Sequence, residues 1–316
     1  MYNFNPQQPA VGISSCLLGE PVRFDGGHKH LPFCSETLSQ YWQLIPACPE
    51  MAIGLGTPRP SIRLQKEADG IIARSADGDD LTAKLTAFSH HYVETLGSLS
   101  GYILCAKSPS CGLERVRIYQ SDSKDHSKTG TGIFAAHLQQ RWPLLPLEDS
   151  GRLNDASLRE NFITRVYLYH QWQSLLHDGV TAQELIQFHT SNKYLLMAHS
   201  QIAYKELGQL LSNLSSELET KADRYINILM QAMKKPASRN SHTNVLHHLQ
   251  GYYKKHLNSG QRQELARVIA DYNQGLLPLL APLTLLRHYQ SQHPSSYLQK
   301  QRYWQPHPYR MGLRNG

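Results

Sequence analysis

The residues most able to do chemistry in this chain are three cysteines that lie far apart in the sequence. Cys16, Cys48 and Cys111 each follow a short apolar run and stand among small residues, glycine or proline. Apolar runs of this length are typical of buried strands. In a parallel sheet the carboxyl ends of the strands share one edge, where ligands bind. We therefore expect the three thiols to meet at one point.

Three converging thiols would form a soft metal site. Their spacings of 32 and 63 residues match neither a zinc finger nor a compact ferredoxin run. Dispersed cysteines are often small buried apolar residues, and we assign Cys34 and Cys105 to that packing role. A site of thiolates alone suits an iron–sulfur cluster or zinc. Three protein ligands leave one position open, which favours chemistry over a purely structural site.

The elements that must position these cysteines alternate between strand and helix. Apolar runs end at Ser14, Ala47 and Ala106, and apolar residues at helical spacing between Leu81 and Leu96 predict a helix. This alternation predicts an α/β domain with a mostly parallel sheet over residues 1–150. A small hairpin of edge strands is expected within residues 62–74.

The second half of the sequence has a different pattern. No convincing strand follows residue 155, so residues 151–316 are predicted to form an all-α domain. The expected helices cover about 155–177, 182–189, 192–212, 217–234, 240–257, 260–274 and 279–290.

Charge is divided unevenly between the two predicted domains. Residues 1–150 hold 13 Lys and Arg against 15 Asp and Glu, whereas residues 151–316 hold 19 against 10. A module with a net charge of +9 suggests a polyanionic partner such as nucleic acid, although a solvated helical surface is the alternative. The basic residues that we select as candidate phosphate contacts are Lys193, Lys234, Lys235, Lys254 and Lys255.

The sequence indicates in which cellular compartment the protein is expected. No apolar run approaches the roughly 18 residues that a membrane span requires. The first residues lack a basic segment followed by an apolar one, so we expect no leader and a cytoplasmic protein. Five cysteines spread over 316 residues argue against a disulfide framework.

At this point the motifs resemble a known family. Residues 10–147 resemble the TudS-type thiouracil desulfidases, and the second half resembles the YbgA-like helical domain. Together the two halves resemble the RudS-type desulfidases, which act on 4-thiouridine in transfer RNA. The first resemblance rests on Ser14–Gly19, Arg23–Gly26, Cys48–Glu50, Gly54–Pro60 and Lys107–Gly112, and the second on His189–Ser200, Gln305–Tyr309 and Leu313–Asn315.

The resemblance implies a cofactor and its ligands. Cys16, Cys48 and Cys111 would hold three irons of a [4Fe-4S] cluster, and the open fourth iron would capture the sulfur of the substrate. Ser14 and Ser15 would donate hydrogen bonds to the cluster sulfides. Removal of the sulfur then requires addition of water at the ring carbon and loss of sulfide, which gives uridine from 4-thiouridine.

The resemblance also implies catalytic side chains. Glu50, two residues after Cys48, would be the general acid or base, the alternative being a surface carboxylate or helix cap. Ser108 would hydrogen-bond the nucleobase or the water, or else stabilise a turn. Lys107 would neutralise sulfide or position the base, or else be a solvated lysine.

Two other functions stay open at the level of sequence. One is the same chemistry on free thiouracil or thionucleosides. The other is a non-catalytic iron–sulfur redox sensor that binds nucleic acid. Glu50 beside Cys48 favours catalysis, because a sensor needs ligands but no acid–base partner. The +9 charge of the second half favours a large anionic substrate, a thiolated transfer RNA.

The ligand assignment predicts which cysteines a cluster requires. Cys16→Ser, Cys48→Ser or Cys111→Ser should each abolish the cluster absorbance after anaerobic reconstitution, together with activity. Cys34→Ser and Cys105→Ala should keep the cluster, with some loss of stability. Full retention of the absorbance in the Cys111→Ser variant would overturn the assignment.

Overall fold

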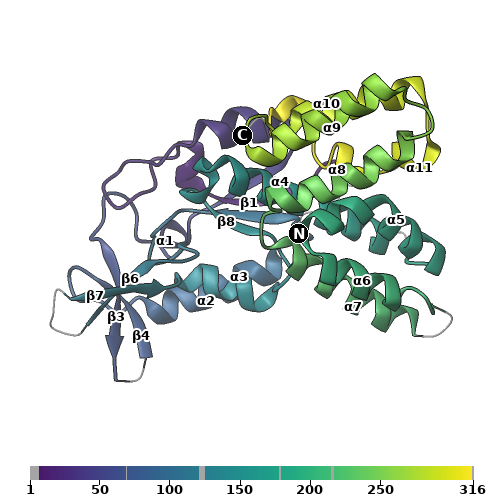
Figure 1. The fold of residues 1–316 in the computed structure, drawn as a ribbon. Coiled ribbons are helices and arrows are strands. Elements are labelled where there is room, and N and C mark those ends of the chain that lie inside the picture. The colour runs from purple at the N-terminus through teal and green to yellow at the C-terminus, as the bar shows by residue number, and fades with distance from the viewer. Residues whose placement is uncertain (1–6, 69, 121–124, 178, 215–216, 315–316) are drawn as a thin grey trace. The chain divides into compact units, whose positions relative to one another are not determined.

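The computed structural model describes residues 7–314 apart from residues 69, 121–124, 178 and 215–216. The chain divides into two compact units, Met1–Asp155 and Ala156–Gly316. Figure 1 shows the strands in the first unit and a series of helices in the second. Each unit is described by itself.

Sheet A is the parallel sheet of the first unit. It consists of β1 (Ala10–Ser14), β2 (Gln43–Ala47), β5 (Gly101–Leu104) and β8 (Leu147–Asp149), in the order β2-β1-β5-β8. All three strand pairs are parallel. Every residue of β1 and β5 is buried, as expected for strands covered on both faces. The predicted α/β fold class is therefore confirmed.

Sheet B is a second sheet that the sequence did not predict as such. It contains β3 (Ile62–Glu67), β4 (Gly70–Ser75), β6 (Val116–Gln120) and β7 (His126–Gly130), in the order β4-β3-β6-β7. The expected hairpin is the β3–β4 pair; β3 and β6 pair in parallel, and β6 and β7 antiparallel. Strand β7 escaped prediction because its exposed residues are all polar and show no apolar alternation.

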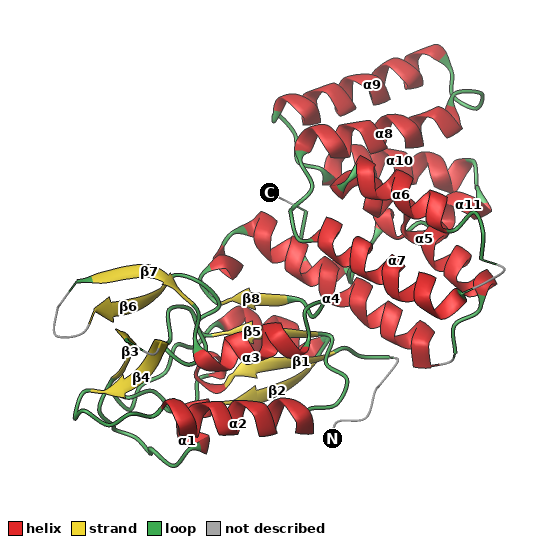
Figure 2. Cartoon of the chain, turned by 90° about the horizontal axis from the view of Figure 1, so that it is seen from below, coloured by secondary structure: helices red, strands yellow, loops and turns green. Residues whose placement is uncertain are grey.

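Three α-helices accompany the sheets: α1 (Pro49–Ala52), α2 (Thr82–Thr95) and α3 (Ile133–Arg141). Helices α2 and α3 pack side by side (Figure 2). Aromatic rings join them to sheet A, where the ring of Phe134 lies edge-on to Tyr102 at 5.5 Å. The remaining turns of helix are short and cover Ser15–Leu18, Phe33–Thr37, Leu38–Gln40 and Arg152–Asn154.

The second unit is helical, as the sequence predicted. In its described residues the predicted break near residue 190 is wrong: one helix runs to His199, and Ser200 caps the next by accepting the N–H of Ala203 at 3.1 Å. None of the described helices is both long enough and apolar enough to cross a bilayer. The helices are α4 (Ala156–His177), α5 (Ala182–His199), α6 (Gln201–Leu210), α7 (Leu218–Met233), α8 (Arg239–Tyr253), α9 (Ser259–Gln274), α10 (Leu280–Gln292) and α11 (Ser296–Gln299).

A buried ion pair ties the two ends of this helical unit together. Arg314 Nε donates to Glu160 Oε1 at 2.7 Å, and His307 Nε2 lies 3.6 Å from the same oxygen. Burial raises the pKa of Glu160, but His307 and Arg314 outweigh it and lower that pKa to about 2. The C-terminal segment is thereby fixed to the first helix of the unit.

The loop Lys107–Gly112 docks on the first turn of α3. The N–H of Phe134 donates to the carbonyl of Ser110 at 2.9 Å, and the N–H of Ile133 donates to that of Pro109 at 3.2 Å. These bonds satisfy helix N–H groups that have no partner within the helix. The loop therefore caps the start of α3, and the N–H groups of Ile133 and Phe134 are bonded to it.

Gly132 makes this docking possible because it has no side chain. A Cβ atom at this position would lie 2.4 Å from the carbonyl oxygen of Ser110. Gly132→Ala should therefore lower stability by about 1–3 kcal/mol, the usual cost of overpacking, and displace the loop that carries Cys111. The measurement is denaturant unfolding together with cluster absorbance.

The control for this variant is Gly208→Ala. Gly208 lies within α6 with no atom near enough to clash with a Cβ, so alanine there should stabilise by about 0.5–1 kcal/mol. Equal effects of the two substitutions would contradict the importance of the loop docking.

Candidate active site

A cavity of about 770 Å³ lies where the strands of sheet A end. Cys16, Cys48 and Cys111 all line it, and so does Cys105, which the sequence had assigned to packing. A cavity of this size is ample for a nucleobase. All of its lining residues belong to the first unit.

The strand order explains why the cysteines meet. Strand β1 lies between β2 and β5, so the segments after these three strands converge at one edge of the sheet. Cys16 lies in the helical turn after β1, and Cys48 is the N-cap residue of α1. Cys105 follows β5 directly, and Cys111 lies in the docked loop.

The four cysteines of the cavity are buried or half-buried. Cys16, Cys105 and Cys111 are buried and Cys48 is half-buried. Burial raises the pKa of Cys111 and that of Cys48. The pKa of Cys16 is raised by its hydrogen bond with Cys105 and by burial. Such thiols ionise when a cation replaces their protons, which is how metal binding and proton release are linked.

This donor set, which consists of thiols, suits an iron–sulfur cluster. Among residues 7–314, gaps excepted, no three His, Cys, Asp or Glu side chains gather closely enough to hold one metal ion. Cysteine thiolates are the usual ligands of iron–sulfur clusters, and the three predicted cysteines line one cavity. Cys16, Cys48 and Cys111 are the residues that would hold it.

Two serines support the thiols. The hydroxyl of Ser14 accepts the N–H of Cys105 at 3.0 Å and hydrogen-bonds the thiol of Cys111, which partly offsets the effect of burial on the Cys111 pKa. Ser15 is buried and also lines the cavity. Ser14 thus binds a cysteine sulfur through its side chain, as supporting residues of metal sites commonly do.

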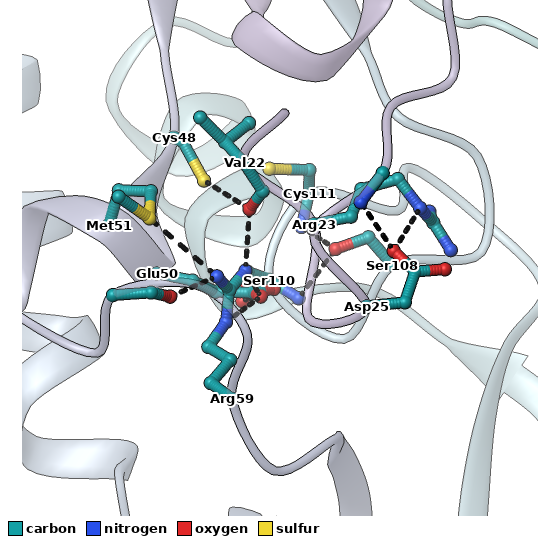
Figure 3. A network of polar contacts seen from close by, with 12 residues as sticks. Val22, Arg23, Asp25, Cys48, Glu50, Met51, Arg59, Ser108, Ser110 and Cys111 are labelled. Carbon is teal, nitrogen blue, oxygen red and sulfur yellow. Dashed lines mark hydrogen bonds and ion pairs between the residues drawn. The ribbon is translucent and has the colours of Figure 1, made fainter. Parts of the chain in front are cut away.

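Glu50 is fixed by contacts to both of its oxygens (Figure 3). Arg59 donates through Nε to Glu50 Oε2 at 3.2 Å, and its Nη2 bonds the same oxygen. Ser110 Oγ donates to Glu50 Oε1 at 2.9 Å. These donors hold the Glu50 carboxylate in one orientation, with one oxygen toward Arg59 and the other toward Ser110.

Arg59 is itself held by backbone oxygens. Its Nη1 donates to the carbonyl of Gly56 at 2.7 Å, and its Nη2 donates to that of Val22 at 2.9 Å. The guanidinium is buried, with its side chain only 3% exposed, against 14% for Glu50. The orientation of the Glu50 carboxylate therefore depends on two loops as well as on its own helix.

Ser108 and Lys107 of the loop Lys107–Gly112, and Asp25 of the motif Arg23–Gly26, each make different contacts. The hydroxyl of Ser108 accepts hydrogen bonds from the N–H groups of Ser110 (3.2 Å) and Cys111 (3.1 Å). These bonds stabilise the turn, the second of the two roles predicted for Ser108. Ser108 also lines the cavity. Lys107 is exposed at the rim, with a left-handed backbone at φ 62° that is uncommon for a lysine. Asp25 accepts the N–H of Gly27 at 3.1 Å and stabilises a turn.

The predicted phosphate contacts lie in the helical unit. Lys234 and Lys235 directly follow α7, and Lys254 and Lys255 directly follow α8; all four are exposed. A lysine at a helix C-terminus also favours the helix dipole, so this position has a structural explanation as well. Lys193 is half-buried, and its ammonium lies 5.8 Å from the ring centroids of Tyr194 and Tyr204.

Sequence reasoning missed two features of the site. Ser110, which was not among the predicted site residues, contacts Glu50, and Arg59 entered the prediction only within the motif Gly54–Pro60. A signal was present for Arg59, because an arginine between two prolines in a glycine-containing loop has few local partners. For Ser110 the sequence held no signal beyond its place in the same loop.

Comparisons with known proteins agree with this description. Residues 11–150 match a family model described as 2-thiouracil desulfurase, and residues 193–308 match one described as a protein of unknown function (DUF1722). The uncharacterized protein YbgA of Escherichia coli (strain K12) is 34% identical over 158 residues, which are 49% of this chain and 94% of YbgA. A solved structure of the [4Fe-4S]-dependent thiouracil desulfidase TudS aligns at 26% identity with a TM-score of 0.39, over 49% of this chain and 100% of that one.

The fold and the cavity thus belong to a desulfurase-type α/β domain joined to a helical domain. The chain belongs to the YbgA family, and its residues 11–150 form a domain of the 2-thiouracil desulfurase family. The predicted resemblance to this pair of domains is confirmed.

The Glu50–Arg59 pair predicts that substitutions can change the stability of the protein and its activity independently. Glu50→Gln removes the charge and leaves a buried guanidinium unpaired, so we expect a stability loss of up to about 3–5 kcal/mol. Activity should fall by roughly 10²-fold or more with cluster assembly intact, because a neutral amide takes no proton.

The double variant Glu50→Gln with Arg59→Met is the control. It removes the unpaired charge and should recover much of the stability but none of the activity. Thermal unfolding and turnover are measured on all three proteins. Turnover at the parent rate in Glu50→Gln would make Glu50 a structural residue only.

Proposed function

We propose that this protein is an iron–sulfur-dependent desulfidase that converts 4-thiouridine in transfer RNA to uridine. The observation that carries the proposal is the convergence, in one cavity, of three strand-end thiols with the fixed carboxylate of Glu50. A structural thiol site needs no such carboxylate. The name of the matched family, 2-thiouracil desulfurase, supports carbon–sulfur cleavage as the reaction.

The reaction is a hydrolysis without net oxidation. Water adds its oxygen to the ring carbon that carries the sulfur, the carbon–sulfur bond breaks, and sulfur leaves as hydrosulfide. A [4Fe-4S] cluster held by Cys16, Cys48 and Cys111 would supply a soft Lewis acid for the sulfur. The printed name of TudS, a [4Fe-4S]-dependent thiouracil desulfidase, agrees with that cofactor.

The residues of this chain handle the proton. Glu50 is the base, and its Oε1 faces Ser110 Oγ while Oε2 stays paired with Arg59. As the water attacks, its proton passes to the carboxylate, and Arg59 and Ser110 keep that carboxylate in one orientation throughout. Fixed donors of this kind lower the cost of reorganisation during the reaction. Lys107 at the rim neutralises the charge of the hydrosulfide that forms.

Transfer RNA is proposed as the substrate because of the second domain. Residues 151–316 carry a net charge of +9, which suits a polyanion and has no purpose for a free base. Lys193, Lys234, Lys235, Lys254 and Lys255 stay the proposed contacts of this domain. Hydrolysis of free thiouracil or thionucleosides is the competing function, because the cavity holds a base equally well.

One experiment separates these functions. The full chain is reconstituted anaerobically and incubated with 4-thiouridine-containing transfer RNA, with free 4-thiouridine and with 2-thiouracil, and products are quantified by mass spectrometry. We expect uridine to appear in the RNA with a kcat/KM at least about tenfold above that of the free nucleoside, because phosphate contacts add affinity.

The Glu50→Gln variant, reconstituted in the same way, is the negative control. Turnover of the free compounds alone would favour the competing function. A fully assembled cluster with no turnover of any of the three substrates would reject the desulfidase and favour a redox sensor.

A further inference from the structure

Residues of sheet B form part of the wall of the cavity. Leu64 of β3 and Ile118 of β6 pair in register and point into an apolar core. Neighbouring residues of a strand point to opposite faces, so Arg63 and Arg117, one residue earlier in each strand, lie level with one another on the other face. Both line the cavity, together with Lys128 of β7.

Charge in the first unit is concentrated at this cavity. Residues 1–150 carry a net charge of −2, yet eight of their 13 Lys and Arg residues line the cavity. Of the 15 Asp and Glu residues, Glu50 is the one among the described lining residues, and Arg59 neutralises it. The eight cations are Arg23, Lys29, Arg59, Arg63, Lys107, Arg115, Arg117 and Lys128.

Among the residues that the structure describes, the cations of the sheet face have no acidic partner. Arg117 and Lys128 are exposed, and neither forms an ion pair with a carboxylate in the part of the chain that the structure describes. Arg74 on the neighbouring β4 is different, because it is paired with Glu67. Unpaired like charges at the mouth of a low-dielectric cavity focus a positive potential there and attract an anion.

An aromatic residue stands among these cations. The guanidinium of Arg63 on β3 lies 5.6 Å from the ring centroid of Tyr119 on β6. The ring centroid of His126 on β7, the strand on the other side of β6, lies 5.2 Å from that of Tyr119. Tyr119 is half-buried and lines the cavity. Cations with interleaved aromatic rings are typical of surfaces that bind single-stranded nucleic acid, where rings stack on bases and cations contact phosphates.

We propose that this face, defined by Arg63, Arg117, Tyr119 and Lys128, binds the RNA backbone on either side of the thiolated nucleotide. This inference rests on the proposed function and moves part of the RNA contact from the helical domain to the catalytic domain. RNA is the occupant that the charge favours, since the face is cationic and continuous with a cavity sized for one base. An enzyme that acts on a base in a chain must hold the flanking backbone while the base enters the cavity.

The test uses the full, reconstituted chain with the double variant Arg117→Glu, Lys128→Glu. We expect kcat/KM for 4-thiouridine-containing transfer RNA to fall about tenfold or more, and that for the free nucleoside, which has no phosphate, to change less than about twofold. Binding of unthiolated transfer RNA across a salt series should show a log–log slope flattened by at least about 1.4, the loss of two phosphate contacts.

The matched control reverses two charges elsewhere on the same domain. Lys84→Glu with Arg141→Glu changes net charge equally at exposed residues of α2 and α3 that do not line the cavity, and should leave the slope and both activities unchanged. Arg117→Lys with Lys128→Arg keeps the charges and should behave as the parent protein. Arg117→Gln with Lys128→Gln replaces the reversal if the latter fails to fold.

Several outcomes would overturn the inference. They are an unchanged RNA slope in the Arg117, Lys128 variant, an equal loss of activity on the free nucleoside, or the same effect in the Lys84, Arg141 control. Loss of RNA binding only when Lys234, Lys235, Lys254 and Lys255 are reversed to Glu would place the contact in the helical domain alone. Binding is measurable without turnover, so a failure of the proposed desulfidase activity is seen separately from a failure of this interface.

Discussion

The docking of one loop on the start of α3 is the constraint on which the site depends. The backbone carbonyl of Ser110 accepts a helix N–H, while its hydroxyl donates to Glu50. One residue therefore joins the helix that packs on the sheet to the carboxylate that faces the cavity. Cys111 is the next residue, so its sulfur is positioned by the same bonds. A shift of this loop would move a ligand and a base at once.

A buried ion pair at the edge of this cavity has an energetic cost that its hydrogen bonds offset. Removing Glu50 and Arg59 from water is unfavourable, and their attraction compensates only when the remaining donors are also satisfied. Here the guanidinium also bonds backbone oxygens of Gly56 and Val22, so few of its donors are left unpaired. The pair is thus better explained as a device for orientation than as a source of net stability. A carboxylate held in this way keeps one orientation beside thiols that are largely buried.

Much of this architecture was predictable because it is encoded locally. Strands β1 and β2 end with their apolar runs at Ser14 and Ala47, and β5 ends at Leu104, two residues before its apolar run does. The parallel topology brings the residues that follow these strands to one edge. What sequence could not supply depends on contacts between distant segments. Whether Ser108 or Ser110 faces Glu50 is decided by the turn, and strand β7 pairs through its backbone despite polar side chains.

The charge of the first unit illustrates the same limit. Its net charge of −2 gave no reason to expect a cationic cavity. A charge summed along the chain does not show which face of a sheet each charged side chain occupies. Arg63 and Arg117 are 54 positions apart in sequence and are brought level by strand register alone. In the helical domain, by contrast, Lys234 and Lys235, and Lys254 and Lys255, are adjacent in the sequence and can be recognised there directly.

The cations that line the cavity affect the release of an anionic product as well as the binding of an anionic substrate. A field that draws phosphates inward acts with the same sign on any small anion formed inside, so such an anion departs against an attraction. Dissolved salt weakens that attraction over about 10 Å at 0.1 M, and it therefore slows capture of a polyanion while it speeds escape of a small one. The cations that line the cavity thus act on both arrival and departure, and ionic strength shifts the balance between the two.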